Sequence, residues 1–170
     1  MDAYQAIVSK RDSRSFTDEP ISEEALRRVL QAGRMAGSAK NLQPCRFVVI
    51  EDAETAERLA GCGQFSSWIP TAPVNIAVVI PADGRDFDAG RAAQNIMVAA
   101  NAEGLASCPV TMHDNTCACE VLGIPDGHRV VIVVAVGYPG AGPRSRGAVG
   151  ARLPFDDYVH RGRWSSASNA

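Results

Sequence analysis

The sequence predicts a single domain that contains both helices and strands. Its 170 residues are the length of one domain, and 46% of them are hydrophobic, which is enough for a core without disulfides or metals. Short aliphatic runs typical of strands alternate along the chain with segments whose apolar residues recur at helical spacing. The sequence has no internal repeat and no linker, so we expect residues 1–164 to form the domain and residues 165–170 to form a polar tail.

In the first half of the chain, N-cap residues and apolar side chains predict three helices and two strands. Ser22 is a preferred N-cap residue, and it is followed by Glu23 and Glu24, where the helix dipole favours acids. Asp52 is positioned to cap the third helix in the same way. The strands are short aliphatic runs bounded by turn residues. The expected elements are helices over residues 3–8, from Ser22 through Gly33 and from Asp52 through Ala60, and strands over residues 46–50 and 74–80.

The second half predicts one long helix, one shorter helix and two extended segments. The long helix carries an alanine-rich stripe that permits close approach of another element, and Gly104 follows it as a typical C′ residue. Asp114 is positioned to cap the shorter helix. The unbroken Val and Ile content of residues 129–136 predicts a strand buried on both faces. The expected elements are helices over residues 86–103 and 114–122, extended segments over 106–112 and 129–136, and a short element over 153–159 in a C-terminal arm rich in Gly, Pro and Arg.

The charge balance and the length of the apolar runs exclude several classes of protein. The 17 Lys and Arg residues nearly balance the 19 Asp and Glu residues, and the net charge of −2 argues against binding to nucleic acid or to an anionic membrane. The N-terminus has no apolar signal core. The longest aliphatic run, residues 130–136, is far shorter than the ~20 residues that span a bilayer. We therefore expect a cytoplasmic protein that spans no membrane.

The cysteines form an odd and scattered set, unlike the disulfide framework of a secreted domain. They are Cys45, Cys62, Cys108, Cys117 and Cys119. On a helix, Cys117 and Cys119 would point to different sides, and no Cys or His pair elsewhere has the spacing of a metal site. We therefore expect reduced cysteines and no bound metal.

Three segments carry residues suited to a ligand that combines a phosphate with a flat ring. Residues 10–14 place three cations within five positions next to a helix end, which suits a phosphate but is also typical of a solvated charged turn. Residues 37–44 offer uncharged donors and acceptors for the polar edge of a heterocycle, and are equally typical of a turn. Arg152 follows a Gly-rich stretch in a locally basic arm, where a lone arginine is usually a surface residue.

The other candidate side chains indicate no catalytic residue. His113 lies beside Asp114, but adjacent residues rarely face each other, and a histidine at a helix start commonly has a structural role. His128 and His160 lie in expected loops. No G-x-G-x-x-G motif follows a strand and no P-loop motif is present, which disfavours a Rossmann or P-loop nucleotide site.

Together, the three segments resemble the flavin-binding nitroreductase family. The family pattern has a stretch R-R-S-x-R-x-F, a loop P-S-x-x-N-x-Q-P-W, a long helix ending in G-L, a G-Y-P after the last core strand and a late R-x-P. The matching pieces, in the same order, are residues 10–16 (KRDSRSF), 37–45 (GSAKNLQPC), 104–105 (GL), 122–125 (LGIP), 137–139 (GYP) and 152–154 (RLP). The loop over residues 37–45 is the most specific of them.

The resemblance implies a fold, a cofactor and an assembly. The fold is an α+β domain with a nitroreductase-like central sheet flanked by helices and an extended C-terminal arm. The assembly is a homodimer with FMN at its interface. The implied FMN-binding residues are Lys10, Arg11, Asp12, Arg14, Ser38, Asn41, Gln43, Pro109, Val110 and Arg152.

Each implied residue has an expected role at the FMN site. The basic residues would hold the phosphate, with Lys10 and Arg11 as alternatives beside Arg14. The two amide side chains of the loop would contact the ribityl chain or the ring edge, and Ser38 would reach the site from the partner subunit. The Pro-Val pair after the long helix would lie along the isoalloxazine ring.

Four positions depart from the family pattern. Lys10 stands at the first Arg position and offers a point charge rather than a fork, so it would hold a phosphate less firmly. Asp12 stands at the Ser position and cannot bind a phosphate, but it could orient Arg14 or accept a hydrogen bond from a flavin hydroxyl. Gly37 replaces a Pro and Cys45 replaces the usual Trp, which opens room near the site.

The activity that the resemblance implies is an FMN-dependent oxidoreductase. NADH or NADPH would reduce the flavin and leave, and a nitroaromatic, a quinone or a similar acceptor would then take the electrons in a ping-pong cycle. Three alternatives stay open. One is a flavin-cleaving enzyme that makes 5,6-dimethylbenzimidazole, a branch that the Arg11-Asp12 pair resembles. The second is a non-catalytic flavin-binding protein, and the third is an unrelated domain in which the motifs occur by accident.

Overall fold

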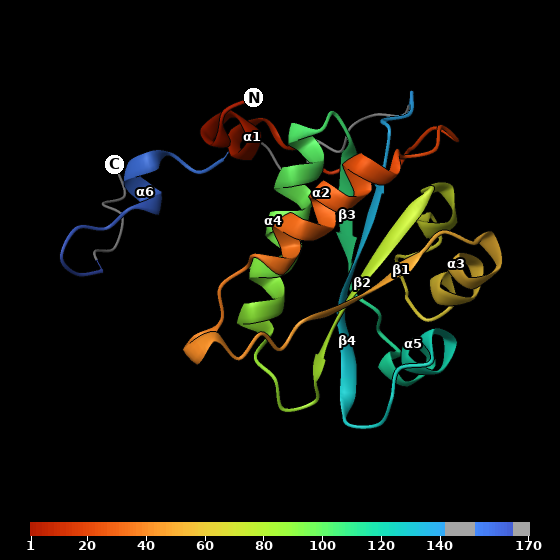
Figure 1. The fold of residues 1–170 in the computed structure, drawn as a ribbon. Coiled ribbons are helices and arrows are strands. Elements are labelled where there is room, and N and C mark those ends of the chain that lie inside the picture. Colours follow the sequence, from red (N-terminus) through yellow and green to blue (C-terminus); the bar gives the residue numbers. More distant parts are fainter. Residues whose placement is uncertain (142–151, 165–170) are drawn as a thin grey trace.

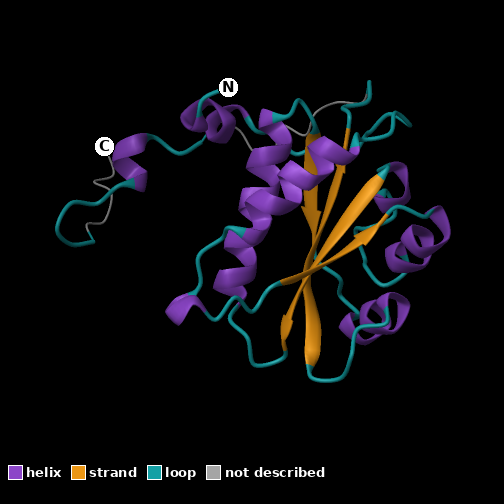
Figure 2. Cartoon of the chain, viewed as in Figure 1, coloured by secondary structure: helices purple, strands orange, loops and turns teal. Residues whose placement is uncertain are grey.

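Four strands form one antiparallel sheet with the order β1-β2-β4-β3 in the computed structural model, which describes residues 1–141 and 152–164. The strands are β1 (Arg46–Ile50), β2 (Val74–Pro81), β3 (Ala106–Val110) and β4 (His128–Gly137). Helices cover both faces of this sheet (Figures 1 and 2). The predicted α+β class is therefore confirmed. The predicted burial of the last long strand fits its central place, because β4 lies between β2 and β3.

The helices begin where the sequence predicts N-cap residues. Oγ of Ser22 accepts a hydrogen bond from the N–H of Ala25 at 3.2 Å. The carboxylate of Asp52 accepts a hydrogen bond from the N–H of Thr55 at 2.8 Å, and that of Asp114 accepts one from the N–H of Cys117 at 2.9 Å. Each carboxylate caps the helix that follows it. The helices of the described residues are α1 (Ala3–Ser9), α2 (Glu23–Arg34), η1 (Ala39–Asn41), α3 (Ala53–Ala60), η2 (Ile69–Thr71), α4 (Asp86–Ala102), α5 (Asn115–Leu122) and α6 (Phe155–Tyr158).

Two boundaries differ from the sequence prediction. The extended segment expected over residues 106–112 ends as a strand at Val110, because its pairing with β4 stops there and the chain turns toward α5. The expected helix over residues 86–103 ends one residue earlier, and Gly104 follows with a φ of 79°. Figure 1 shows residues 152–164 beyond α1 and away from the sheet. The expected polar tail, residues 165–170, lies outside the described residues.

One face of the sheet is closed by α4, with α2 packed across it (Figure 1). The predicted alanine stripe faces inward, and its members Ala89, Ala92 and Ala100 are fully buried beside Ile96. Small side chains let the two helices approach closely: a Cβ added to Gly33 in α2 would lie 2.7 Å from Cγ1 of Ile96. No helix of the described ranges is long and apolar enough to cross a membrane.

The other face is closed by α3, η2 and α5, which are all short. Their buried side chains join those of the sheet in a second core cluster that includes Leu59, Ile69, Val110, Met112 and Ala118. Each of these helices has eight residues or fewer, so the face is assembled from separate pieces rather than from one rod.

A disulfide between Cys62 and Cys117 joins two of these pieces, and it corrects the expectation of reduced cysteines. Cys62 follows the end of α3 and Cys117 lies in the first turn of α5, with a Cα–Cα distance of 5.6 Å. The two cysteines are 55 residues apart in the sequence. Only the packing of α3 against α5 brings them together, so cysteine spacing alone gives no sign of this pair. The free cysteines of the described residues are Cys45, Cys108 and Cys119.

Candidate functional site

The predicted basic segment lies along the outer edge of β3. Asp12 forms an isolated parallel bridge with Ser107, and the N–H of Ser13 donates to the carbonyl oxygen of Ser107 at 3.1 Å. Because β3 is an edge strand of the sheet, its outer side is open to this segment. The backbone therefore fixes residues 10–14 beside the strand that carries Pro109 and Val110.

The cations of this segment differ in what they bind. Nζ of Lys10 forms an ion pair with the carboxylate of Asp12 and lies 3.3 Å from Sδ of Met97 in α4. The guanidinium of Arg11 donates to backbone carbonyls of its own segment, at Val8 and Lys10, with distances of 2.8 and 2.7 Å. The carboxylate of Asp12 therefore pairs with Lys10, and no ion pair between Asp12 and Arg14 is found in the described residues.

Arg14 lies between two side chains that the sequence does not connect with it. Its guanidinium lies over the ring of Trp68, 5.8 Å from the ring centroid. It also faces the buried thiol of Cys108. Burial raises the pKa of this thiol, and the nearby carboxylate of Asp12 raises the pKa further, while Arg14 and Lys10 act in the opposite direction. Sequence reasoning missed Trp68, because this residue joins the site only through the tertiary fold.

The predicted uncharged loop has an unusual backbone. Lys40, Asn41 and Gln43 have φ values of 51°, 54° and 49°, in the left-handed region that residues other than glycine rarely adopt. Oγ of Ser38 accepts a hydrogen bond from the N–H of Gln43 at 2.8 Å and so closes the loop. Such strained residues often gather at binding sites. The side chains of Asn41 and Gln43 are exposed and are free to contact a ligand or a second chain.

The loop and the basic segment lie at different ends of the molecule. The loop follows the C-terminal end of α2, at the end of α4 opposite to α1 (Figure 1). It borders a groove of about 790 Å³ between α2 and β1, which is lined by Arg34, Ser38, Cys45 and Asp88 among others. Burial and then the carboxylate of Asp88 raise the pKa of the Cys45 thiol, while Arg46 lowers it. One chain thus does not bring the two predicted parts of the site together.

The remaining predicted residues are divided in the same way. Pro109 is half-buried on β3, whereas Val110 is only 9% exposed and packs into the core beneath α3 and α5. Arg152 is exposed, and its segment lies away from the sheet. The structure therefore gathers the residues Lys10, Asp12, Arg14 and Pro109 along one strand edge, and it leaves Ser38, Asn41, Gln43 and Arg152 apart from them.

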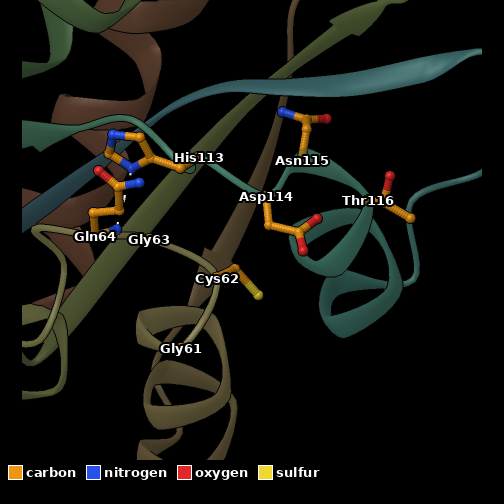
Figure 3. A pocket seen from close by; sticks show the side chains of 8 residues that line it. All are labelled: Gly61, Cys62, Gly63, Gln64, His113, Asp114, Asn115 and Thr116. Atoms are coloured by element: carbon orange, nitrogen blue, oxygen red, sulfur yellow. Dashed lines mark hydrogen bonds between the residues drawn. The ribbon is translucent and has the colours of Figure 1, made fainter.

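A separate open pocket of about 550 Å³ lies between the end of α3 and the start of α5 (Figure 3). Nδ1 of His113 accepts a hydrogen bond from the N–H of Gln64 at 3.1 Å, and the carboxylate of Asp114 caps α5. These bonds give His113 and Asp114 the structural roles that the sequence favours. In the described part of the chain, no three metal-binding side chains come together.

The comparisons with known proteins identify the family. A model of the Nitroreductase family matches residues 7–62 and 65–138. The chain belongs to the nitroreductase family. A protein of Archaeoglobus fulgidus is 29% identical over 175 residues, which cover 96% of this chain and 99% of that protein. A Bacillus subtilis relative named FMN reductase [NAD(P)H] is 25% identical and matches 94% of this chain and 73% of its own length.

Solved structures of the family agree with the fold. The structure described as NADPH:FMN oxidoreductase from Vibrio harveyi, complexed with NAD⁺, superimposes with a TM-score of 0.85 at 25% identity. The superposition covers 96% of this chain and 78% of that one. The resemblance that the sequence motifs indicate is confirmed, together with the nitroreductase fold.

Proposed function

We propose that the protein is an FMN-dependent oxidoreductase that uses NADH or NADPH to reduce nitroaromatics, quinones or similar acceptors in a ping-pong cycle. The family and its relatives support the general part of this function, because members are named FMN reductase [NAD(P)H] and NADPH:FMN oxidoreductase. The chain is accordingly an NAD(P)H-dependent flavin oxidoreductase. The acceptor and the ping-pong order are our proposals.

The observation that carries the proposal is the gathering of cations at the outer edge of β3. FMN ends in a phosphate, which needs cationic or N–H donors, and Lys10 and Arg14 both lie in the segment that bridges to Ser107, close enough to Cys108 to act on its thiol. In the described residues, no carboxylate lies within ion-pair distance of Arg14, so its charge is available to a ligand. Trp68 and the Cys108 thiol hold the guanidinium in place. These residues fit the phosphate end of FMN.

Bound FMN supplies the redox chemistry, since it accepts a hydride from NAD(P)H and passes electrons to the acceptor. The role of the protein chain is to bind FMN and to position it. Arg14 and Lys10, joined by Arg152, would hold the phosphate, Pro109 would lie along the ring, and Asn41 and Gln43 would contact the ribityl chain or the ring edge. No side chain is required as a general acid or base, in keeping with the structural roles of His113 and Asp114.

We further propose that the working form is a homodimer with the cofactor at the interface. The loop is separated from the basic segment within one chain, and its Asn41 and Gln43 side chains are exposed. Exposed apolar side chains gather in the C-terminal arm: Leu153, Phe155, Tyr158 and Trp164 are between 66% and 83% exposed. A second copy would cover these side chains and could bring its loop to the basic segment. In this arrangement Ser38 acts by closing the loop.

Flavin titrations test the site. Arg14→Ala and Arg152→Ala should each weaken FMN binding by ~1–3 kcal/mol, the scale of a lost charged hydrogen bond. Arg11→Ala is the matched control, because this guanidinium donates to its own backbone, and its dissociation constant should stay near that of the wild type. Quenching of flavin fluorescence gives all of these dissociation constants. Unchanged affinity in both Arg14→Ala and Arg152→Ala would contradict the phosphate assignment.

Product analysis separates the proposed activity from the flavin-cleaving alternative, which the carboxylate of Asp12 at the Ser position favours. Steady oxidation of NADPH or NADH in the presence of menadione, with FMN recovered intact, supports our proposal. Formation of 5,6-dimethylbenzimidazole from FMN and oxygen would overturn it. A bound flavin that never turns over would indicate a flavin carrier.

A further inference from the structure

The Cys62–Cys117 disulfide lies where the core meets an open pocket. Cys62 is 2% exposed and contributes to the second core cluster, whereas Cys117 is only half-buried. Cys62 also lines the open pocket of about 550 Å³, and Figure 3 shows its sulfur directed toward α5. The bond therefore joins a sheltered cysteine that lines the pocket to a cysteine that is partly exposed, although Cys117 also packs against the second core cluster. Disulfides with an exposed sulfur exchange more readily than fully buried ones.

The cross-link also holds the connector that follows β3. The N–H of Asp114 donates to the carbonyl oxygen of Cys62 at 2.9 Å, and the N–H of Gln64 donates to Nδ1 of His113 at 3.1 Å. The turn after α3 is thus joined to the connector before α5 by two hydrogen bonds and to the first turn of α5 by the disulfide. Because this connector starts directly after Val110, these bonds together anchor the end of β3.

The cysteine set is not that of a structural disulfide framework. Frameworks in secreted domains use even numbers of cysteines at close spacing, whereas this chain has five, scattered over its length. Cys45, Cys108 and Cys119 are free in the described residues. An isolated disulfide beside an open pocket is more typical of a redox-responsive pair than of a permanent cross-link.

We propose that Cys62 and Cys117 form a reversible thiol–disulfide exchange site whose reduction loosens the end of β3. The reductant is a dithiol, either small or carried by a protein. Its thiolate attacks the sulfur of Cys117, the S–S bond to Cys62 breaks, and Cys62 leaves as a thiolate. The second thiol of the reductant then displaces Cys117. Overall, one dithiol and one disulfide give one disulfide and the Cys62 and Cys117 thiols, with two electrons and two protons transferred to the protein.

Alkylation in denaturant tests whether the pair exchanges. Intact-mass measurement after maleimide labelling should show three labels for the oxidised protein and five after dithiothreitol, consistent with the free cysteines of the structure. Removal of dithiothreitol and addition of oxidised glutathione should restore three labels. Five labels under every oxidising condition, or labels that never exceed three in native dithiothreitol, would overturn the proposal.

The order of attack has its own test in single variants. Cys62→Ala leaves Cys117 alone, and Cys117→Ala leaves Cys62 alone. With an aromatic disulfide such as 5,5′-dithiobis(2-nitrobenzoate), Cys117 in the first variant should react at least ~10-fold faster than Cys62 in the second, as peptide mapping by mass would show. Equal rates, or faster reaction of Cys62, would overturn the assignment of Cys117 as the attacked sulfur.

The link to the β3 end rests on the proposed function, so it needs a readout that separates the two. Reduction should lower the Tm by about 5–15 °C and raise the FMN dissociation constant roughly five-fold or more. The double variant Cys62→Ala/Cys117→Ala should have the Tm and the FMN dissociation constant of the reduced protein, and dithiothreitol should change neither value. In Cys119→Ala, dithiothreitol should change both values as it does in the wild type. A Tm that falls with unchanged FMN affinity would overturn the link to β3. A protein that binds no FMN in either state would contradict the proposed function, and the labelling would still decide the exchange site.

Discussion

The two faces of the sheet are closed by different means. One face is covered by α4, a helix of 17 residues whose alanines are buried against the strands. Helix α2 packs on α4 with Gly33 against Ile96. The other face is covered by α3, η2 and α5, none longer than eight residues, with a disulfide between α3 and α5. A long helix gains cohesion from its own backbone hydrogen bonds, whereas short helices are marginal alone. We infer that the disulfide between α3 and α5 adds the stability that these two short helices lack by themselves.

The largest expected effect is on the disulfide face. The double variant Cys62→Ala/Cys117→Ala should lose about 4 kcal/mol of unfolding free energy, because the bond closes a loop of 55 residues in the unfolded chain. Urea denaturation measures the loss of unfolding free energy. Hydrogen exchange should show that the variant speeds exchange more in α5 than in α4. Cys119→Ala, at a free cysteine of the same helix, should change the unfolding free energy and the exchange rates far less than the double variant does. Uniformly faster exchange in both helices would mean that the two faces do not differ.

Removal of side-chain volume should affect the helical face nearly as strongly. Ile96 is fully buried between α2 and the sheet, so Ile96→Ala should cost about 3 kcal/mol in urea denaturation. Ile7→Ala is the matched control on an exposed position, since Ile7 is 56% exposed, and it should stay within about 0.5 kcal/mol of the wild type. An effect of Ile96→Ala no larger than that of the control would contradict the close packing of this face.

Addition of volume at the α2–α4 contact should be less damaging but still measurable. Gly33→Ala places a Cβ 2.7 Å from Cγ1 of Ile96 and 3.0 Å from Cζ of Phe47, and we expect a loss of about 2 kcal/mol. Gly90 is a helical glycine of α4 with no atom within 4 Å of an added Cβ. Gly90→Ala should therefore stabilise the protein by about 0.5–1 kcal/mol. Opposite signs in thermal denaturation would support the packing of α2 on α4, and equal signs would argue against it.

The smallest effect concerns the cap of α3. Hydrogen bonds from Thr55 lower the pKa of Asp52. Because the pKa is lower in the folded state, the cap stabilises fully above the ordinary value of about 3.9 and is lost as the pH falls through the folded pKa. Asp52→Asn keeps an acceptor and should remove this part of the pH dependence of the Tm below pH 4. Parallel Tm curves for the variant and the wild type would contradict the role of the carboxylate.

Local signals explain how much of the fold the sequence predicts. Ser22, Asp52 and Asp114 act on amides within three residues, so the helix starts are accurate. The antiparallel order β1-β2-β4-β3 depends on contacts between distant segments, and local periodicity does not contain it. The sequence does not indicate the pairing of Cys62 with Cys117 for the same reason, since the two cysteines meet only when α3 packs on α5.

In the candidate site, too, local features are predicted from the sequence and contacts between distant segments are not. The motif order alone indicates Lys10, Arg14 and the loop, because spacing along the chain is a local property. The contacts of Arg14 with Trp68 and Cys108 require the fold, since 54 and 94 residues separate them from Arg14 in the sequence. The expected phosphate role of Arg11 is weakened by its bonds to its own backbone, which no pattern of residue types reveals.

Pro109 has a consequence for the solution behaviour of the protein. It lies in β3, at the edge of the sheet, where an exposed row of backbone groups invites another strand to pair. Proline offers no N–H, and the neighbouring Ser107 is already bridged by Asp12. This edge is therefore poorly suited to pairing with a strand of another molecule, which disfavours the growth of β-sheet fibrils from it.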